Sequence, residues 1–239
     1  MNILFLGPTC PRIENLLRAL GHFVHREEGR LSSDFSKNNF FNFCISYRYH
    51  YILTPSIIHA FQNGLINMHI SLLPWNRGSD PNLWSFLENT PKGVTIHHID
   101  ETLDTGAIIL QQSVYFDETK ETLRTTYSKL SNAVESLFTD HVESILNRVL
   151  PYHPQPSGGS FHRSRDKIPF LPLLKEKGWD TPVGVLTGAG LGCAPRQPAT
   201  SDKKVVSSLF DELPPRASSS KSKSTEKLSE HNFSDHSVF

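Results

Sequence analysis

Two polar side chains within one short apolar run are the first candidates for chemistry. Asn67 and His69 lie two positions apart in residues 65–73, whose composition predicts a β-strand. Residues i and i+2 of a strand project from the same face, so both side chains are expected to point together near the strand's carboxyl end. Asp104 follows the next predicted strand, 93–99. Because ligands bind at the carboxyl ends of parallel strands, we expect Asp104 to lie within reach of the pair.

An amide, an imidazole and a carboxylate together suit acyl transfer to an amine. The attacked carbonyl becomes an oxyanion, which the amide of Asn67 or a protonated His69 ring can stabilise; losing one such donor costs about 2.7 to 4 kcal/mol in a well-studied hydrolase. The amine must also lose a proton, which a histidine can accept near neutral pH. His69 therefore has two candidate roles. Asp104 is expected to orient that ring or to hold a relay water.

Alternating strands and helices are expected to position these side chains. Apolar and β-branched runs predict strands over residues 2–7, 41–53, 65–73, 93–99 and 107–114. Helical spacing predicts helices over 11–21, 55–63 and 122–149, with a short one around Trp84. This alternation predicts an α/β fold with a largely parallel sheet. Gly7 follows the first strand without a Gly-x-Gly-x-x-Gly pattern, so an NAD site is not expected.

Charge and cysteine content narrow the class of partner. The 24 Lys and Arg residues balance 24 Asp and Glu residues, which leaves no basic field for nucleic acid or a membrane surface. No apolar run approaches the roughly 20 residues of a spanning helix, and the first residues lack a signal-peptide pattern. Cys10, Cys44 and Cys193 have no metal-like spacing, so no zinc site or disulfide framework is expected. We expect a cytoplasmic protein with a small-molecule substrate; a homodimer stays open.

A longer pattern surrounds the three polar residues. Its positions are Asn67-x-His69-x-Ser71-Leu72-Leu73-Pro74, Arg77-Gly78, Pro81, Trp84, Gly93-Val94-Thr95, and Asp100-x-x-x-Asp104-x-Gly106. This pattern resembles the catalytic core of the folate-dependent formyl transferases, which include glycinamide ribonucleotide formyltransferase, methionyl-tRNA formyltransferase and the sugar-nucleotide N-formyltransferases. The resemblance implies a Rossmann-like fold, 10-formyltetrahydrofolate as co-substrate, no metal, and Asn67, His69 and Asp104 as the catalytic triad. It is dense over residues 46–112 and recognisable over 1–185.

The same resemblance implies binding residues. It places these positions beside the pterin of the folate: Tyr49, Tyr51, Ile52, Leu53, Ile99, Asp100 and Leu103. Segments 75–78 and 159–167 look most like those of sugar N-formyltransferases, so the expected substrate is a nucleotide-linked amino sugar. Its expected contacts are Trp75, Arg77, Gly78 and Arg163, because the fork geometry of arginine suits phosphate groups. For the charged residues of 163–167, exposure to solvent is the alternative.

Two departures from the family pattern affect these expectations. The stretch between the first helix and residue 41 is short, so one strand–helix unit of the N-terminal half is expected to be missing or abbreviated. The tRNA-holding β-barrel domain of methionyl-tRNA formyltransferases has no counterpart, so a tRNA substrate is not expected. The catalytic domain is expected to span residues 1–187, and the low-complexity segment 188–239 is expected to be disordered.

Other functions and residue roles stay open. The functions are formylation of another small amine such as a glycinamide ribonucleotide, hydrolysis of formyl-folate, and folate binding without catalysis; retention of all three triad residues argues against the last. Of the adjacent His97 and His98, only one can face the site, because neighbours in a strand point to opposite faces. Ser71 is expected to shape its turn rather than to act as a nucleophile, and Asp100 to brace its loop.

Overall fold

The computed structural model describes residues 1–32, 35 and 40–191, and its centre is a six-stranded sheet. The strands are β1 (Asn2–Leu6), β2 (Phe23–Glu27), β3 (Phe43–Ser46), β4 (Leu65–His69), β5 (Arg77–Gly78), β6 (Gly93–His98), β7 (Ile108–Ser113) and β8 (Phe161–His162). The α-helices are α1 (Pro11–Ala19), α2 (Pro55–Phe61), α3 (Pro81–Leu87), α4 (Leu123–Asp140), α5 (Val142–Leu146) and α6 (Leu171–Leu174). Short 3₁₀ turns cover Ser164–Phe170, Gly178–Asp180 and Val183–Val185.

The sheet has the strand order β2-β1-β3-β4-β6-β7. β2, β1, β3 and β4 pair in parallel, whereas β6 pairs antiparallel with both β4 and β7. The prediction of a largely parallel α/β sheet is therefore confirmed. β5 and β8 form a separate two-stranded parallel ladder.

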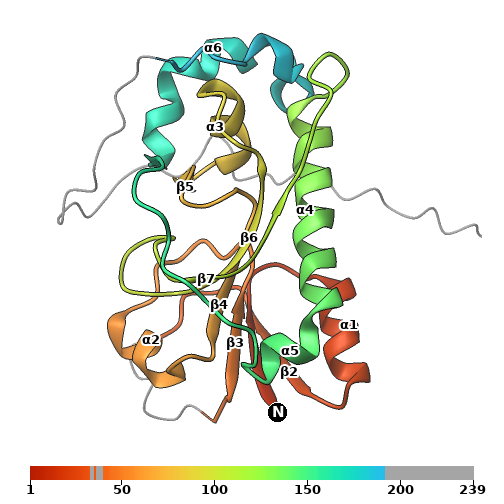
Figure 1. Cartoon of the computed structure of the whole chain (residues 1–239), viewed down its shortest axis with the longest axis vertical. Coiled ribbons are helices and arrows are strands. Elements are labelled where there is room, and N and C mark those ends of the chain that lie inside the picture. Colours follow the sequence, from red (N-terminus) through yellow and green to blue (C-terminus); the bar gives the residue numbers. More distant parts are fainter. Residues whose placement is uncertain (33–34, 36–39, 192–239) are drawn as a thin grey trace, which may run out of the picture. The chain divides into compact units, whose positions relative to one another are not determined.

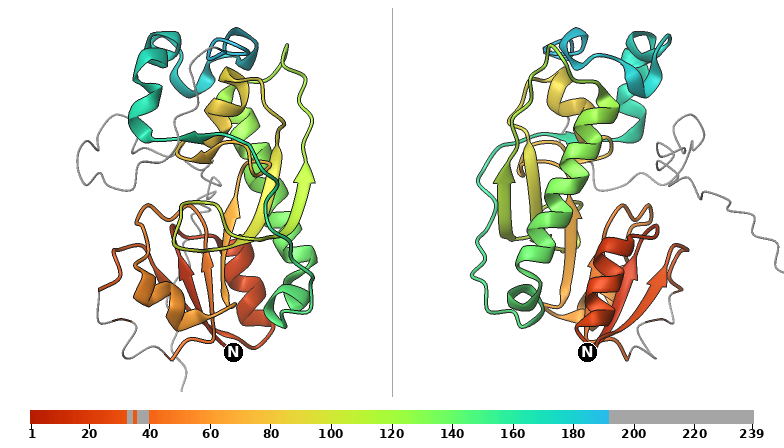
Figure 2. Two further views of the ribbon diagram at one scale, coloured as in Figure 1. Left: turned by 60° about the vertical axis from the view of Figure 1, so that its left-hand side comes forward. Right: turned by 90° about the vertical axis from the view of Figure 1, so that its right-hand side faces the viewer.

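Helices cover both faces of the sheet (Figures 1 and 2). On one face, buried residues of α1, α4 and α5 share a hydrophobic cluster with Ile3, Ile45 and Ile66. On the other face, α2 packs on Leu4 and Leu65. Alternate residues of the strands thus enter two different cores, as the two-residue period of a strand requires.

Local sequence explains where the helices begin. α1 and α2 each carry proline in the first turn, where its missing N–H costs no helical hydrogen bond. α4 begins with a capping box, in which the Thr122 hydroxyl accepts from the Thr125 N–H at 3.2 Å and the Thr125 hydroxyl accepts from the Thr122 N–H at 2.9 Å. α4 packs across β4, β6 and β7 and so supports the strands that carry the polar residues.

Two predicted elements need correction. β2 was not predicted, because this edge strand reads Phe-Val-His-Arg-Glu and only Val24 is buried among its five residues. The abbreviation of the N-terminal half therefore does not remove this strand, and the described residues between β2 and β3 form no α-helix. The single helix predicted over 122–149 is also wrong, because α4 ends at Asp140 and α5 begins at Val142.

The end of the described chain packs against α3. The Gly188 N–H donates to the Phe86 carbonyl at 3.0 Å, and the Gly190 N–H donates to the Leu87 carbonyl at 2.8 Å. The remainder of the predicted tail, from residue 192, lies outside the described residues, and the domain boundary at 187 stays a prediction. Within the described part of the chain, no helix has the length and apolar character needed to cross a membrane.

The turn after β1 depends on Gly7. Its φ is +126°, and a Cβ at this position would lie 2.0 Å from the Tyr47 carbonyl oxygen at the end of β3. Gly21 also has a positive φ, +81°, but nothing lies within 4 Å of the Cβ that it lacks. An added Cβ at Gly21 would therefore introduce backbone strain alone, whereas one at Gly7 would introduce both strain and steric overlap.

We predict that Gly7→Ala lowers the free energy of unfolding by about 3 kcal/mol, because it adds overlap with β3 to the strain of a positive φ. The matched control, Gly21→Ala, should cost about 1 kcal/mol, from strain alone. Urea unfolding of both variants measures the difference. Equal losses would show that the close approach of Gly7 to Tyr47 has no energetic weight.

Candidate active site

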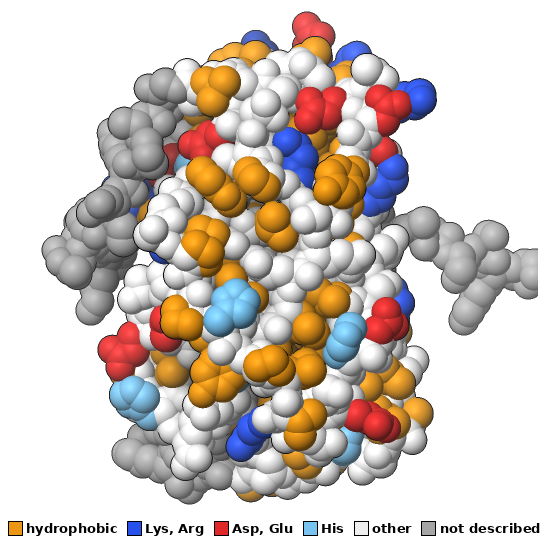
Figure 3. All heavy atoms as spheres, viewed as in Figure 1, with side chains coloured by type: hydrophobic (Ala, Val, Ile, Leu, Met, Phe, Trp, Pro, Cys, Tyr) orange, Lys and Arg blue, Asp and Glu red, His pale blue; other side chains and the backbone are white. Residues whose placement is uncertain are grey.

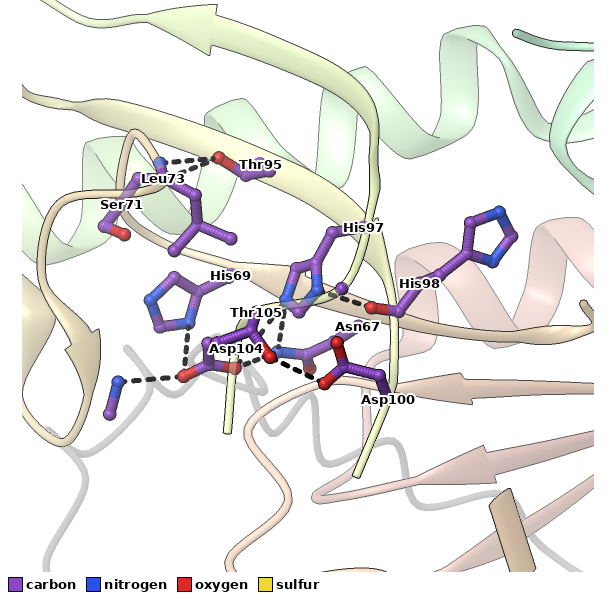
Figure 4. Close-up of polar contacts among 12 residues, drawn as sticks. Asn67, His69, Ser71, Leu73, Thr95, His97, His98, Asp100, Asp104 and Thr105 are labelled. Atoms are coloured by element: carbon purple, nitrogen blue, oxygen red, sulfur yellow. Dashed lines mark hydrogen bonds and ion pairs between the residues drawn. The ribbon is translucent and has the colours of Figure 1, made fainter. Parts of the chain in front are cut away.

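The pairing of β4 with β6 places four polar side chains on one face of the sheet. Asn67 pairs with His97, and His69 pairs with Thr95. The intervening Met68 belongs to the core beneath α4. The prediction that Asn67 and His69 project together is therefore met, and Figure 4 shows their side chains turned toward Asp104.

Asp104 reaches this face by a route that the sequence analysis did not foresee. Because β6 is antiparallel to β4, it ends beside the start of β4, where the Ile99 N–H donates to the Leu65 carbonyl at 3.1 Å. The loop after β6 folds back over the sheet to bring Asp104 to the site. The expected position was correct, but the stated reason, a shared carboxyl edge of parallel strands, does not apply to β6.

The Asp104 carboxylate is the meeting point of the site. One oxygen accepts from the Gly78 N–H at 2.9 Å and lies 3.8 Å from His69 Nδ1. The other accepts from Asn67 Nδ2 at 3.2 Å and lies 3.6 Å from His97 Nε2. Burial raises the pKa of Asp104, but the two histidine rings and these hydrogen bonds outweigh it, so the pKa lies below its ordinary value. The carboxylate is therefore charged at neutral pH.

His97 is a neutral histidine that fixes the Asn67 amide. Its Nδ1 lies 2.7 Å from the His98 carbonyl oxygen, which can only accept, so Nδ1 carries the proton. Burial lowers the pKa of His97 to about 4, against the opposing effect of Asp104. Nε2 therefore accepts a hydrogen bond from Asn67 Nδ2 at 3.2 Å. Both hydrogens of the Asn67 amide are thus engaged, one by His97 and one by Asp104.

His69 has hydrogen-bond acceptors beside both ring nitrogens. Nε2 lies 3.2 Å from the Asn76 carbonyl oxygen, so this nitrogen carries a proton. Nδ1 faces the Asp104 carboxylate, and the side chains of His69 and Asp104 are each 9% exposed. The ring is therefore held between a carbonyl oxygen and a carboxylate. Of the two roles considered for His69, the geometry favours donation to a developing oxyanion.

A braced loop between β4 and α3 presents the Asn76 carbonyl. The Ser71 hydroxyl donates to the Trp75 carbonyl at 2.7 Å, which is the turn contact expected of it. Thr95 donates to the Ser71 carbonyl at 2.7 Å and accepts from the Leu73 N–H at 3.1 Å. Asn76 is fully buried, and its amide donates to the Thr90 hydroxyl at 2.7 Å. The loop is thus held by side chains of β6 and of its own ends.

The residues predicted to contact the substrate lie on and beside the β5–β8 ladder. Arg77 and Gly78 form β5 and pair with Phe161 and His162 of β8. Arg163 follows β8 directly, and Trp75 lies two residues before β5, 36% exposed. The ladder therefore brings Arg77 and Arg163 together from distant parts of the sequence, and the Gly78 N–H connects it to Asp104.

The predicted folate residues come from two segments, 49–53 and 99–103, and fall into a partly buried group and an exposed group. Tyr49, Leu53 and Ile99 are partly buried against the core beneath α2. Tyr51, Ile52 and Leu103 are exposed, Ile52 at 78%. Asp100 braces its loop by accepting from the Thr102 N–H at 3.0 Å and the Thr105 hydroxyl at 2.7 Å. Both segments thus contact one core, and Glu101 of the second lies 3.1 Å from His59 of α2.

Some side chains at the site had no signal in the sequence. Ser160 and Gln155 hydrogen-bond to backbone groups of distant loops, and Asn76 acts through its own backbone carbonyl, which contacts His69; no spacing rule reveals such contacts. His97 was one of two alternatives, and the period of β6 settles it: His97 faces the site, whereas His98 points away from it (Figure 4). The His98 ring packs edge-on against Tyr152. In the described residues, no group of three His, Cys, Asp or Glu side chains could hold a metal ion.

Comparison with known proteins identifies the family. The family described as formyl transferase matches residues 38–142. The solved structure of the formyltransferase PseJ from Anoxybacillus kamchatkensis is 46% identical, with a TM-score of 0.77, and the match covers 80% of this chain and 100% of that one. The chain belongs to the folate-dependent formyl transferase family. The PseJ structure is a complex with UDP-4,6-dideoxy-4-formamido-L-AltNAc and tetrahydrofolate.

More distant relatives share the fold or part of the length. A sugar N-formyltransferase from Shewanella is 20% identical with a TM-score of 0.59, and the match covers 70% of this chain and 78% of that one. The methionyl-tRNA formyltransferase of Thermodesulfovibrio yellowstonii is 32% identical over 135 residues, which are 56% of this chain and 41% of that protein. The methionyl-tRNA formyltransferase of Lachnospira eligens is 33% identical over 125 residues, which are 50% of this chain and 39% of that protein. The chain thus spans less than half the length of these curated formyl transferases.

The neutral state of His97 predicts a specific loss of stability in mild acid. In the unfolded chain a histidine takes up a proton below its ordinary pKa of about 6.5, whereas folded His97 does so only near pH 4. Its contribution to stability is therefore lost as the pH falls from about 6.5 toward 4. Protonation of Asp104, whose pKa is lowered, affects the free energy of unfolding only below the ordinary pKa of aspartate, about 3.9, and so does not overlap this pH window.

We predict that the free energy of unfolding falls by about 2 kcal/mol more in the wild type than in His97→Gln between pH 7 and pH 5. Urea unfolding at the two pH values measures this difference. His153→Gln, which alters an exposed histidine, serves as the control and should follow the wild type. Parallel curves for wild type and His97→Gln would mean that His97 is not held neutral.

Proposed function

We propose that this chain transfers the formyl group of 10-formyltetrahydrofolate to the amino group of a nucleotide-linked amino sugar, in the cytoplasm. The proposal rests on the convergence of Asn67, His69 and Asp104 in a chain that is 46% identical to PseJ over the whole of the PseJ chain. Formyl transfer to a sugar amine is the reaction that the complex of PseJ represents, because it contains a formamido sugar nucleotide and tetrahydrofolate.

Asn67 and His69 stabilise the charge that develops on the formyl oxygen. Of the two N–H bonds of the Asn67 amide, His97 retains one, so the N–H directed at Asp104 is the one exchanged for the oxyanion. His69, as an imidazolium beside it, supplies a second donor and a positive charge. Such preorganised donors act in a site largely closed to water, where each is worth several kcal/mol.

Asp104 takes the proton that the amine loses, directly or through a water. The amine nitrogen forms a bond to the formyl carbon, the bond from that carbon to N10 of the folate breaks, and N10 receives the proton that Asp104 took from the amine, which restores the carboxylate. Asp104 is the charged base of the cluster, because the Nε2 of His97 accepts from Asn67 and the Nε2 of His69 carries a proton toward the Asn76 carbonyl. The products are a formamido sugar nucleotide and tetrahydrofolate.

Exposed apolar groups beside the triad suit the flat pterin of the folate. Tyr51 and Ile52 precede α2, and Leu103 precedes Asp104; all three expose large apolar surface. Both segments pack on the core beneath α2, and His59 of α2 lies 3.1 Å from Glu101. We propose that the pterin lies between these segments, with Tyr49, Leu53, Ile99 and Asp100 supporting them.

The substrate is proposed to lie on the side of the β5–β8 ladder. Trp75 offers an exposed ring beside Arg77 and Gly78, and Arg163 adds a second cation from β8. Two local arginines are sufficient for a diphosphate, whereas tRNA needs many phosphate contacts. The face in Figure 3 shows scattered Lys and Arg side chains among hydrophobic ones rather than a continuous basic field.

The test is a panel of acceptors supplied with 10-formyltetrahydrofolate. The panel contains UDP- and dTDP-linked amino sugars, glycinamide ribonucleotide, charged initiator tRNA and buffer alone. We expect tetrahydrofolate release, read by absorbance, together with a formamido sugar nucleotide, read by mass spectrometry. His69→Ala and Asp104→Ala should lower kcat by about 10² to 10⁴ with unchanged circular dichroism.

Each contrary result has a distinct meaning. Formylation of tRNA or glycinamide ribonucleotide alone would refute the sugar substrate. Folate release without any amide product would indicate hydrolysis. Near-normal turnover in folded His69→Ala or Asp104→Ala would refute the mechanism.

We further predict that Arg163→Ala raises the KM for the sugar nucleotide about tenfold while the KM for the folate stays within about twofold, because a phosphate contact belongs to substrate binding. Arg165→Ala, an exposed arginine two residues on, is the matched control and should leave both constants unchanged. Steady-state kinetics with each substrate varied in turn measures this. Equal changes in both KM values would place Arg163 outside the phosphate site.

A further inference from the structure

After α5, the chain runs back beside β7 and past the loop that carries Asp104 before it reaches β8. We call residues 147–163 the return segment. It first pairs with the edge strand β7, where the N–H groups of Ile108 and His153 each donate to the other's carbonyl, at 2.8 and 3.0 Å. It ends by pairing β8 with β5. Between these two points it meets the loop that carries Asp104.

The contact with that loop is made by Gln155. Its side-chain nitrogen, Nε2, donates to the carbonyl of Asp104 at 2.8 Å and to the carbonyl of Gly106 at 3.0 Å. Carbonyl oxygens only accept, and an amide nitrogen has two hydrogens, so the bonds match the donor one to one. Gln155 is half-buried.

The stretch held in this way has an unfavourable backbone conformation. Asp104 has a φ of +55°, in the left-handed region that a residue with a Cβ rarely adopts. Gly106 lies so close to the end of β6 that a Cβ would be 1.8 Å from the His98 carbonyl oxygen. Such a conformation persists only where surrounding contacts enforce it.

We propose that Gln155 is a positioning residue for the Asp104 carboxylate, which it sets by holding the backbone of residues 104–106. It contacts the backbone carbonyl of Asp104 and not the carboxylate. The carboxylate itself is held by Gly78 and Asn67. Gln155 therefore controls where the carboxylate lies relative to His69.

The same segment also determines the other neighbour of His69. The Ser160 hydroxyl accepts from the Asn76 N–H at 3.0 Å and donates to the Asn76 side-chain oxygen at 3.2 Å. The Asn76 carbonyl in turn accepts from His69 Nε2. Both ring nitrogens of His69 thus face groups that the return segment holds, Asp104 through Gln155 and Asn76 through Ser160.

The decisive test reads the His69 ring without substrate. The wild type, Gln155→Met, Asp104→Asn and Ser157→Ala are titrated by NMR with ¹⁵N-labelled histidine, and His69 is assigned from His69→Gln. We expect the pH profile of the His69 ring signals in Gln155→Met to move toward that of Asp104→Asn, because the carboxylate is displaced. Ser157→Ala, an exposed position on the same segment, should match the wild type.

A second variant separates positioning from loss of packing. Gln155→Glu keeps the length of the side chain but directs a carboxylate at two carbonyl oxygens. As the pH falls this carboxyl gains a proton and regains one donor, so the His69 signal should return toward its wild-type position. A purely structural defect would not recover in acid.

Turnover is a further measurement, and its interpretation rests on the proposed function. With the sugar nucleotide, Gln155→Met should lower kcat about tenfold or more at KM values within about twofold. A His69 titration identical to the wild type in both Gln155 variants would overturn the inference. If the titration shifts but the wild type formylates no amino sugar, the proposed substrate fails and the role of Gln155 stands.

Discussion

A buried negative charge is the interaction on which the site depends. Removing a carboxylate from water costs several kcal/mol unless hydrogen bonds and opposite charge compensate. At Asp104 the compensation comes from the β5 backbone, the Asn67 amide and the His69 ring. These groups come from two strands, β5 and β4, so satisfying one charge fixes the placement of both strands relative to the loop that carries Asp104. The geometry needed for acyl transfer follows from an electrostatic requirement of the folded state.

The reversed direction of β6 is what permits this arrangement. In a fully parallel sheet, the residue opposite Asn67 would be followed by a chain leaving at the carboxyl edge. Here the ladder sets His97 opposite Asn67, and the following loop must fold back across the face of the sheet. One strand therefore supplies both a neutral acceptor for the amide, through His97, and the connection that delivers the carboxylate. Thr95 of the same strand braces the loop that reaches His69.

The sequence could predict features that follow from the two-residue repeat of a strand. It could not predict contacts between loops that lie far apart in the sequence. Asn67 and His69 share a face because a strand repeats every two residues, and the same rule separates His97 from His98. β2 was not predicted because an edge strand with one buried side chain has a weak apolar pattern. The break at His141 between α4 and α5 has no proline or glycine to mark it. Gln155 contacts backbone carbonyls, and Asn76 contacts His69 through its own backbone carbonyl, so neither contact leaves a trace in composition or spacing.

The two-residue ladder between β5 and β8 has a consequence for how the protein is made. It joins residues 77–78 to residues 161–162, so the loop beneath His69 lacks its partner until the chain has been synthesised past His162. The parallel sheet from β1 to β4 contains more local pairings and can form earlier. A nascent chain thus acquires its sheet before it acquires a competent catalytic centre. Conversely, detachment of β8 would abolish catalysis while most of the sheet stays folded, so loss of activity is expected to precede loss of secondary structure during gradual denaturation.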